Sequence, residues 1–563
     1  QHKVVIDAMG GASAGGMTTI MAAMYGLKGK IKPVTDPSKV GGVRENIFYD
    51  SWVLLDDANP GDSRGTFDKV WDTADMNDNV IRSFFNSKFI DTISNRAVQI
   101  GDGKIETQIG QLPPYISKDL EMLISICTLR GIPFEINFTT PIGDGLASNK
   151  PSFATYDHFT LAHFKLNNGQ NPGEAYLWLN PFETQWLTAL RKVSIATGAF
   201  PFGLRYREFD YATFSDTYLK RAAERIMLKG KENASIDWKN FPNNFSFVAV
   251  DGGTVNNDPF GEILQVLEDR YGKTPFDKLP QYGMVMIDPF PNFNESHVYT
   301  PPTNLAGIPG NLLSTLRHQA TLKRNEIINS FDNNYFLGMI YPVRWLAKDM
   351  PDPYPITSAS VGAFGGLLDI NFRHYDFFLG RNNARNFFRY FFTMPYDPGN
   401  NIVHPVHKDW TPEMVEVFKV ENKAGKVFLP IIPDMSLFGK TAQQKFDERI
   451  HYSIDKKPKY NPDKLFALEG LIKKRLERIV ELLPEQKLPG ITDPSTKAYP
   501  ITEALLKKKF GPSFFGKIGN AISKPFQKGI INAAKNKLVN GGTEGVIKYI
   551  LKDLEDRELL EKK

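Results

Sequence analysis

A serine stands among small residues near the start of the 563-residue chain, in the run Gly11-Ala12-Ser13-Ala14-Gly15. The run fits G-x-S-x-G, the pattern of a nucleophile elbow, in which a serine lies on a sharp turn from a strand into a helix. Larger neighbours would collide with the sheet there, and the amides at the helix N-terminus stabilise negative charge. The run therefore predicts a catalytic serine, and its alternative interpretation is a small-residue packing turn.

A carboxylate that could serve this serine follows the apolar run at residues 245–250. Asp251 stands there, directly before Gly252 and Gly253. An aspartate at the carboxyl end of a strand lies where the active sites of α/β proteins gather, and a carboxylate can take the proton of a hydroxyl. In isolation, the same three residues also fit an ordinary turn with a solvated aspartate.

Together, the two segments resemble the patatin-like phospholipase family, whose G-x-S-x-G serine and D-G-[GA] aspartate form a catalytic dyad without histidine. Three more segments resemble that family and occur in its order, which extends the resemblance over about residues 1–395. They are Asn256-Asn257-Asp258-Pro259 after the two glycines, Ala196-Thr197-Gly198-Ala199-Phe200-Pro201 before Asp251, and residues 376–383.

The resemblance implies a serine acyl hydrolase of the phospholipase A or lysophospholipase type, which cleaves acyl esters of lipids. Ser13 is then the nucleophile and Asp251 the general base, and an acyl-enzyme forms and is hydrolysed. The carboxylate can do this only if desolvation raises its basicity. The implied fold is a patatin-like three-layer α/β arrangement with a mainly parallel central sheet and a helical C-terminal extension. No cofactor and no metal ion are expected.

The family also carries a glycine-rich oxyanion loop a few tens of residues before its serine, whereas only twelve residues precede Ser13. We expect that loop, and any signal peptide, to lie upstream of Gln1, which is not a natural first residue. The amide of Ala14 supplies one oxyanion donor. A bacterial-type location in the cytoplasm or at a membrane surface is expected, and secretion remains open.

Two other functions compete with a dyad hydrolase. A Ser-His-Asp esterase would take its base from His297, His318 or His404, which follow Asp251 in the chain order of α/β-hydrolases. That fold needs several strands before its elbow, which the residues before Ser13 do not provide. The missing glycine loop instead favours a catalytically silent lipid-binding or scaffold protein.

Other kinds of site are disfavoured. Met17 stands where a phosphate loop needs its lysine, so nucleotide binding is not expected. His404 and His407 lack a carboxylate pattern for a metal, and the single cysteine, Cys127, lies in an apolar run typical of a buried residue. Lys and Arg number 68 against 63 Asp and Glu, and this net charge of +5 argues against a nucleic-acid partner. Nothing in the sequence indicates the oligomeric state.

The elements expected to position the site lie in the first thirty residues and at about 120–290, where strands and helices alternate, and the residues between are expected to be loop-rich. The pattern predicts a short buried strand at 3–6, a buried helix at 17–25, and strands at 134–139, 245–250 and 284–287. Further on, it predicts helices at 311–331 and 384–392, an irregular region at 394–462, and an amphipathic helix at 463–483. The expected domains are a catalytic unit (1–300), its helical continuation (301–395), a Pro-rich region with the amphipathic helix (396–500) and a basic tail (501–563).

The basic tail carries its own signal. Residues 501–540 contain eight lysines and a single acidic residue, Glu503, with Phe and Ile mostly three or four residues apart. The pattern is typical of an amphipathic helix on a membrane surface, and a helix docked on the protein's own core fits it equally well. Residues 548–563, of mixed charge, are expected to form a solvated helix. No apolar run of about 18 residues occurs that could span a membrane.

Overall fold

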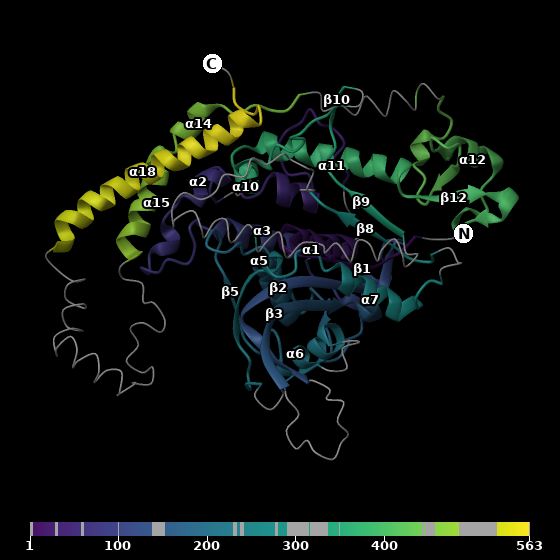
Figure 1. The fold of residues 1–563 in the computed structure, drawn as a ribbon, viewed down its shortest axis with the longest axis horizontal. Coiled ribbons are helices and arrows are strands. Elements are labelled where there is room, and N and C mark those ends of the chain that lie inside the picture. Colours follow the sequence, from purple (N-terminus) through teal and green to yellow (C-terminus); the bar gives the residue numbers. More distant parts are fainter. Residues whose placement is uncertain are drawn as a thin grey trace, which may run out of the picture.

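A central α/β body carries a long helix above it, a small sheet at one end and a pair of helices at the other (Figure 1). This arrangement comes from a computed structural model. The residues that it describes are 4–28, 32–57, 61–99, 101–137, 152–228, 234–236, 241–275, 280–289, 315, 336–347, 350–441, 444, 456–483 and 526–561.

A seven-stranded mixed sheet forms the centre of the body. Its strands are β1 (Ile6–Gly11), β2 (Ile116–Asn137), β3 (Ser152–Lys165), β4 (Leu177–Trp178), β5 (Arg207–Phe209), β6 (Ala234–Ile236) and β7 (Phe247–Asp251). The order is β4-β3-β2-β7-β5, and β1 and β6 also pair with β2. Among these described pairs, β1–β2 and β3–β4 are parallel and the other four are antiparallel.

The expected mixture of helices and strands is confirmed, but the prediction of a mainly parallel sheet is wrong. Parallel neighbours need a crossover between successive strands, usually a helix. Helices do separate β1 from β2, but none lies between β2 and β3 within the described residues, and these two strands form a long antiparallel ribbon. Alternating apolar residues indicate a strand but not its direction, so the sequence pattern could not reveal this pairing.

Strand β1 begins later than the sequence pattern predicts. Val4 and Val5 precede it and are exposed, and the strand continues through both glycines of the Gly10-Gly11 pair. A Cβ on Gly10 would lie 2.7 Å from the carbonyl oxygen of Leu123 and 2.8 Å from Ile263 Cδ1 of α7 (Phe260–Tyr271). The sequence suggested only a turn here, whereas Gly10 allows a helix to pack closely onto the strand.

Helices cover both faces of the sheet. On one face, α1 (Ser13–Lys28) packs against β2 and against α5 (Thr184–Thr197). Its residues Ile20, Met24 and Leu27 are buried at helical spacing, which confirms the predicted buried helix. Gly11 faces α1 and Gly10 faces α7. Because adjacent residues of a strand face opposite ways, α7 covers the other face of the sheet. Three further helices of this body are α3 (Lys88–Val98), α4 (Ile105–Ile109) and α6 (Asp216–Ala222).

Beyond the central sheet, the structure departs from the irregular region predicted at 394–462. Its first part forms a small antiparallel sheet beside α12 (Pro412–Phe418), with strands β12 (Thr393–Asp397), β13 (Ile402–Val403), β14 (Val420–Glu421) and β15 (Val427–Pro430). The long helix above the body is α11 (Ile370–Tyr390), which contains most of the predicted helix 384–392. The predicted strand 284–287 is β8 (Gly283–Ile287), which pairs with β9 (Phe336–Ile340). The predicted helix 311–331 lies outside the described residues apart from Thr315.

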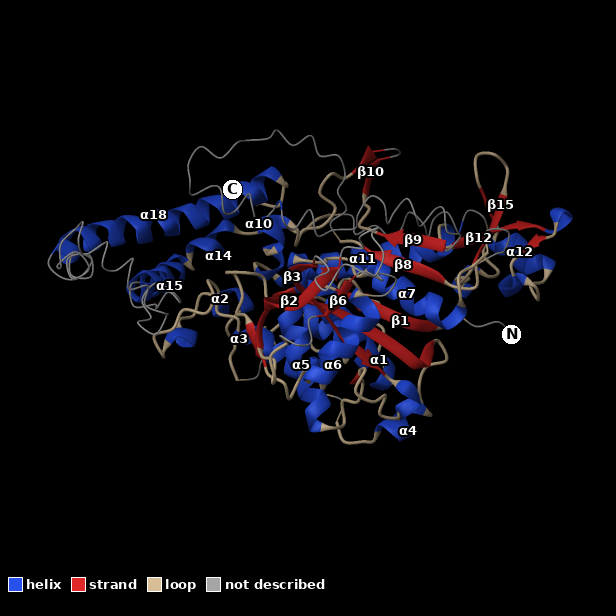
Figure 2. Cartoon of the chain, turned by 60° about the horizontal axis from the view of Figure 1, so that its bottom comes forward, coloured by secondary structure: helices blue, strands red, loops and turns tan. Residues whose placement is uncertain are grey.

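A second apolar core joins segments that are far apart in the sequence. It combines Trp71 and Phe89 with Phe372, Ile472 and Leu554. Two of its helices, α15 (Glu469–Leu482) and α18 (Phe526–Asp556), lie side by side in both views (Figures 1 and 2). The predicted amphipathic helix 463–483 is confirmed as α14 (Pro462–Phe466) followed by α15. One core is thus shared by residues from both ends of the chain.

The last residues of the chain belong to this core, so the prediction of a solvated helix at 548–563 is wrong. Ile550, Leu554 and Leu559 are each no more than 3% exposed, and Leu560 forms a β-bridge with Tyr460. The apolar residues recur every three or four positions and form a stripe, which the mixed charge of this segment obscured. The basic residues 501–525 lie outside the described residues.

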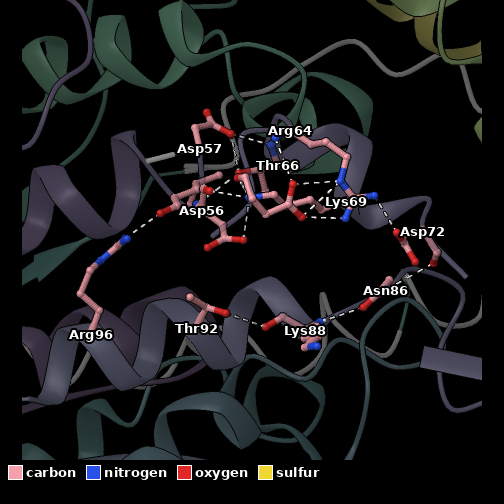
Figure 3. Close-up of polar contacts among 12 residues, drawn as sticks. Asp56, Asp57, Arg64, Thr66, Lys69, Asp72, Asn86, Lys88, Thr92 and Arg96 are labelled. Carbon is pink, nitrogen blue, oxygen red and sulfur yellow. Dashed lines mark hydrogen bonds and ion pairs between the residues drawn. The ribbon is translucent and has the colours of Figure 1, made fainter. Parts of the chain in front are cut away.

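Polar contacts fix the residues around Asp56 and Asp62, which lie beside this core (Figure 3). The buried Lys69, on α2 (Thr66–Val70), donates to Asp56 Oδ2 at 2.9 Å and to the carbonyl oxygens of Asp56 and Asp62. Arg96 of α3 donates to the carbonyl oxygens of Asp50 and Leu55, at 2.6 Å each. These bonds satisfy backbone groups that a loop would otherwise bury unpaired.

Candidate active site

Two strands point toward each other along one edge of β2. Strand β1 runs parallel to β2 and ends with Gly11 opposite Ile124, whereas β7 runs antiparallel and ends with Asp251 opposite Ile126. Their carboxyl ends therefore meet on either side of Ser125. We call the place where Gly11, Ser125 and Asp251 come together the β1–β7 junction. Residues that are 238 positions apart in the sequence come together here.

The turn after β1 holds Ser13 in an unusual backbone conformation. Ser13 begins α1 with a φ of 52°, in the left-handed region that non-glycine residues rarely adopt. Gly11 is needed because a Cβ there would lie 2.7 Å from the carbonyl carbon of Gly15. At Gly15, in contrast, no atom lies within 4 Å of a Cβ, and this residue and Ala14 are exposed. A residue without a side chain was expected to be necessary on both sides of the serine, but the structure requires one only at Gly11 and not at Gly15.

The hydroxyl of Ser13 points at Asp251. Ser13 Oγ donates to Asp251 Oδ2 at 2.7 Å, and Oδ1 of the same carboxylate accepts from the Gly253 amide at 2.8 Å. Asp251 is 5% exposed, and its amide donates to the carbonyl oxygen of Ala199 at 3.0 Å. The carboxylate is therefore held in one orientation beside the serine, shielded from water.

Close packing against backbone requires the first glycine after Asp251, and the second lies against a side chain. A Cβ on Gly252 would lie 2.1 Å from the carbonyl oxygen of Ser125, and one on Gly253 would lie 2.7 Å from Asn257 Oδ1. The chain continues as the 3₁₀ turn η5 (Gly252–Thr254), in which the Gly253 amide donates to the carboxylate. The two glycines thus let the backbone after Asp251 press against the junction.

Three parts of the site were not singled out in the sequence. The amide of Ser13 donates to Thr197 Oγ1 at 3.0 Å, and this hydroxyl donates to the carbonyl oxygen of Ser125 at 2.9 Å. Gly16 leaves space for that threonine, because a Cβ there would lie 2.6 Å from Thr197 Oγ1. Thr197 stands in the segment that resembles the patatin-like family, and Gly16 is the second glycine of a pair, so both had a visible signal. The carbonyl of Ser125 had none.

Of the three candidate histidines of a catalytic triad, His404 is among the described residues. His404 Nε2 donates to the carbonyl oxygen of Pro280 at 3.1 Å, and His404 Nδ1 accepts from the Val406 amide at 3.2 Å. Both of its ring nitrogens are therefore engaged with backbone groups. His297 and His318 lie outside the described residues.

Cys127 lies on β2 opposite Val250, beside the site, and is buried as predicted. Burial, together with the negative charge of Asp251, raises the pKa of the Cys127 thiol to about 11. The thiol is therefore protonated at neutral pH and is a poor nucleophile. The rings of His404 and His407 are 6.2 Å apart, and the described residues contain no group of three or more His, Cys, Asp or Glu that could hold a metal ion.

No protein-family model matches the chain, and no solved structure matches it. The chain is 27% identical over 433 residues to the uncharacterized protein y4iI of Sinorhizobium fredii. The match covers 69% of this chain, which spans 58% of the length of that relative. The description of that relative names no activity. Among the helices of the described residues, none is both long and apolar enough to cross a bilayer.

Proposed function

We propose that this protein is a serine acyl hydrolase that cleaves acyl esters of lipids through a Ser13–Asp251 dyad, as its resemblance to the patatin-like phospholipases implies. The observation that carries the proposal is the 2.7 Å hydrogen bond from Ser13 Oγ to Asp251 Oδ2. A nucleophile and its base need to lie within hydrogen-bond reach, about 2.6–3.2 Å, for proton transfer. The low exposure of Asp251 meets the need for a desolvated carboxylate.

In the proposed reaction, Ser13 Oγ attacks the ester carbonyl carbon while its proton moves to Asp251 Oδ2. The tetrahedral intermediate collapses, the proton passes to the leaving alcohol oxygen, and the acyl group stays on Ser13. Water then attacks the acyl-enzyme, giving its proton to Asp251, and this proton returns to Ser13 Oγ as the fatty acid leaves. One carboxylate serves both half-reactions.

Negative charge develops on the carbonyl oxygen in both half-reactions and needs hydrogen-bond donors. The amide of Ala14 lies in the first turn of α1, where amides have no acceptor within their own helix. Ala14 and Gly15 are exposed and a Cβ on Gly15 would meet open space, so a substrate can approach from this side. We assign Ala14 as one oxyanion donor.

The test is covalent labelling with a long-chain fluorophosphonate, which reacts with activated serines. The wild-type protein should be labelled at Ser13 and should hydrolyse a p-nitrophenyl acyl ester, and Ser13→Ala should do neither while unfolding at the same temperature. Labelling at another serine would contradict the assignment of the nucleophile. A folded protein without labelling or hydrolysis would favour the silent lipid-binding alternative, and a histidine variant as inactive as Ser13→Ala would favour a triad.

We also propose that the basic segment 501–540 attaches the enzyme to an anionic lipid surface. Each lysine near such a surface contributes about 1 kcal/mol, and this attraction weakens with salt. Removing the tail is not a clean test, because α18 supplies Ile550 and Leu554 to the second core. Changing Lys507, Lys508, Lys509 and Lys517 to glutamine should instead reduce sedimentation with anionic vesicles. Unchanged sedimentation would contradict the anchor, and hydrolysis of a soluble ester should persist.

A further inference from the structure

One short segment at the end of α5 touches both members of the dyad. Thr197 Oγ1 accepts from the Ser13 amide, and the carbonyl oxygen of Ala199 accepts from the Asp251 amide, each at 3.0 Å. Between them, Gly198 lies against α1, since a Cβ there would come within 2.2 Å of Met17 Cε. Residues 197–199 therefore contact the elbow, the helix after it and the strand that carries the base.

The hydroxyl of Thr197 is buried, and both of its roles are defined by its partners. Its residue is 0% exposed, an amide can only donate to it, and the carbonyl oxygen of Ser125 can only accept from it. The hydroxyl thus links the nucleophile's own amide to the backbone at the centre of the β1–β7 junction. The same Ser125 carbonyl contacts Gly252, directly after the base.

This link acts on the one residue of the dyad whose backbone is strained. Ser13 has a φ of 52°, and such conformations persist only where surrounding contacts hold them. Relaxation toward an ordinary helical φ would rotate the serine side chain away from its 2.7 Å contact with Asp251 Oδ2. Gly16 and Thr197 fit together here, because a side chain at position 16 would occupy the place of the hydroxyl.

We propose that Thr197 is a positioning residue whose hydroxyl holds Ser13 in the left-handed conformation that directs Oγ to Asp251. The kinetic consequence rests on the proposed hydrolase function. The structural consequence is that the Ser13 amide stays hydrogen-bonded to Thr197 Oγ1, and it does not depend on that function.

The test compares three variants. Thr197→Val removes the hydroxyl at nearly constant shape, and Thr197→Ser keeps it. Thr128→Val is the matched control, because Thr128 on β2 is 1% exposed and its hydroxyl has no hydrogen-bond partner among the described residues. We expect Thr197→Val to slow fluorophosphonate labelling of Ser13 by about 100-fold, with kcat reduced far more than KM changes. Thr197→Ser and Thr128→Val should label within about threefold of the wild type.

A threonine that only supports the fold would lower the unfolding temperature without slowing the labelling of folded protein. Labelling of folded Thr197→Val at the wild-type rate would therefore overturn the proposal. If Thr197→Val does not fold, Gly16→Ala replaces it, because the added methyl displaces the hydroxyl while leaving Thr197 in place. Normal labelling of Gly16→Ala would equally overturn it.

Hydrogen exchange of the Ser13 amide separates this proposal from the proposed function. The amide should be protected in the wild type and in Thr197→Ser and exposed in Thr197→Val. An unreactive wild-type protein that shows this pattern would contradict the hydrolase and support the positioning role. Equal protection in all variants would contradict the positioning role even in an active enzyme.

Discussion

The β1–β7 junction and the core between α15 and α18 are held together in different ways. At the junction, backbone groups, two hydroxyls and the Asp251 carboxylate make the contacts, and glycines at positions 11, 16 and 252 leave space for them. In the second core, large apolar side chains from distant segments pack together, and the buried Arg475 of α15 forms an ion pair with Asp75. The junction fixes the distance between Ser13 Oγ and Asp251 Oδ2, whereas the core holds distant segments together. Substitutions in the two regions should therefore affect different measurements.

The largest effect is expected from Asp251→Asn at the junction. The amide keeps the shape of the carboxylate but cannot take the proton of Ser13, so kcat/KM for a soluble ester should fall about 10³-fold or more. The free energy of unfolding, measured in urea, should change little. Substantial residual hydrolysis in this variant would mean that another group removes the proton.

Arg475→Met should have the opposite profile. The Arg475 guanidinium donates to both oxygens of Asp75, at 2.8 and 3.0 Å, and to the carbonyl oxygens of Asp72, Ser83 and Phe84. Removing it leaves these groups without their donor, which should lower the free energy of unfolding by about 3–5 kcal/mol. The exposed neighbour Lys473 gives the control Lys473→Met, which should be neutral. Loss of esterase activity in folded Arg475→Met would show that the two regions are coupled.

A smaller effect, seen only in acid, is expected from Glu121 of β2, in the scaffold of the junction. Burial raises its pKa, but hydrogen bonds from His163 Nε2 at 2.8 Å and Lys165 at 3.1 Å, together with the positive charge of Lys165, lower the pKa to about 2. Arg270 also donates to Glu121, at 3.0 Å. Since the folded pKa is below the unfolded one, this stabilisation is present above about pH 4.5 and is lost as the pH falls toward 2.

Urea unfolding of the wild type and of Glu121→Gln should measure this contribution. The variant should lose less stability than the wild type between pH 5 and pH 3, because its side chain takes up no proton. Glu135→Gln, on the same strand but outside this network, should follow the wild type. Parallel curves for all three proteins would show that Glu121 does not contribute.

Short local patterns predicted the parts of the site that depend on backbone space. Gly11 before Ser13 and Gly252 after Asp251 were visible because only glycine fits against the neighbouring backbone there, and Gly253 was visible as the second glycine of its motif. The meeting of Ser13 with Asp251 could be expected only from the family resemblance, since no local pattern spans 238 positions. The carbonyl of Ser125 has no sequence signal at all, because every residue carries one.

The sheet and the C-terminus show where sequence patterns mislead. The strand predicted at 134–139 is the end of the much longer β2, and its periodicity says nothing of the antiparallel partner. At 548–563, mixed charge suggested a solvated helix, whereas the stripe of Ile550 and Leu554 completes a core made by residues before position 100. Burial of that kind depends on a distant surface, which a local pattern does not contain.

The position of Leu554, Leu559 and Leu560 in the second core sets an order for folding during synthesis. The central sheet and α7 are complete by Tyr271, so the β1–β7 junction can assemble while the rest of the chain is still being made. Trp71 and Phe89 must wait for Leu554 and Leu559 before their own core closes. At about 5–20 residues per second, the ribosome needs roughly 15–60 s for the intervening residues. During that interval the nascent protein presents an uncovered apolar surface, to which chaperones that recognise such surfaces can bind.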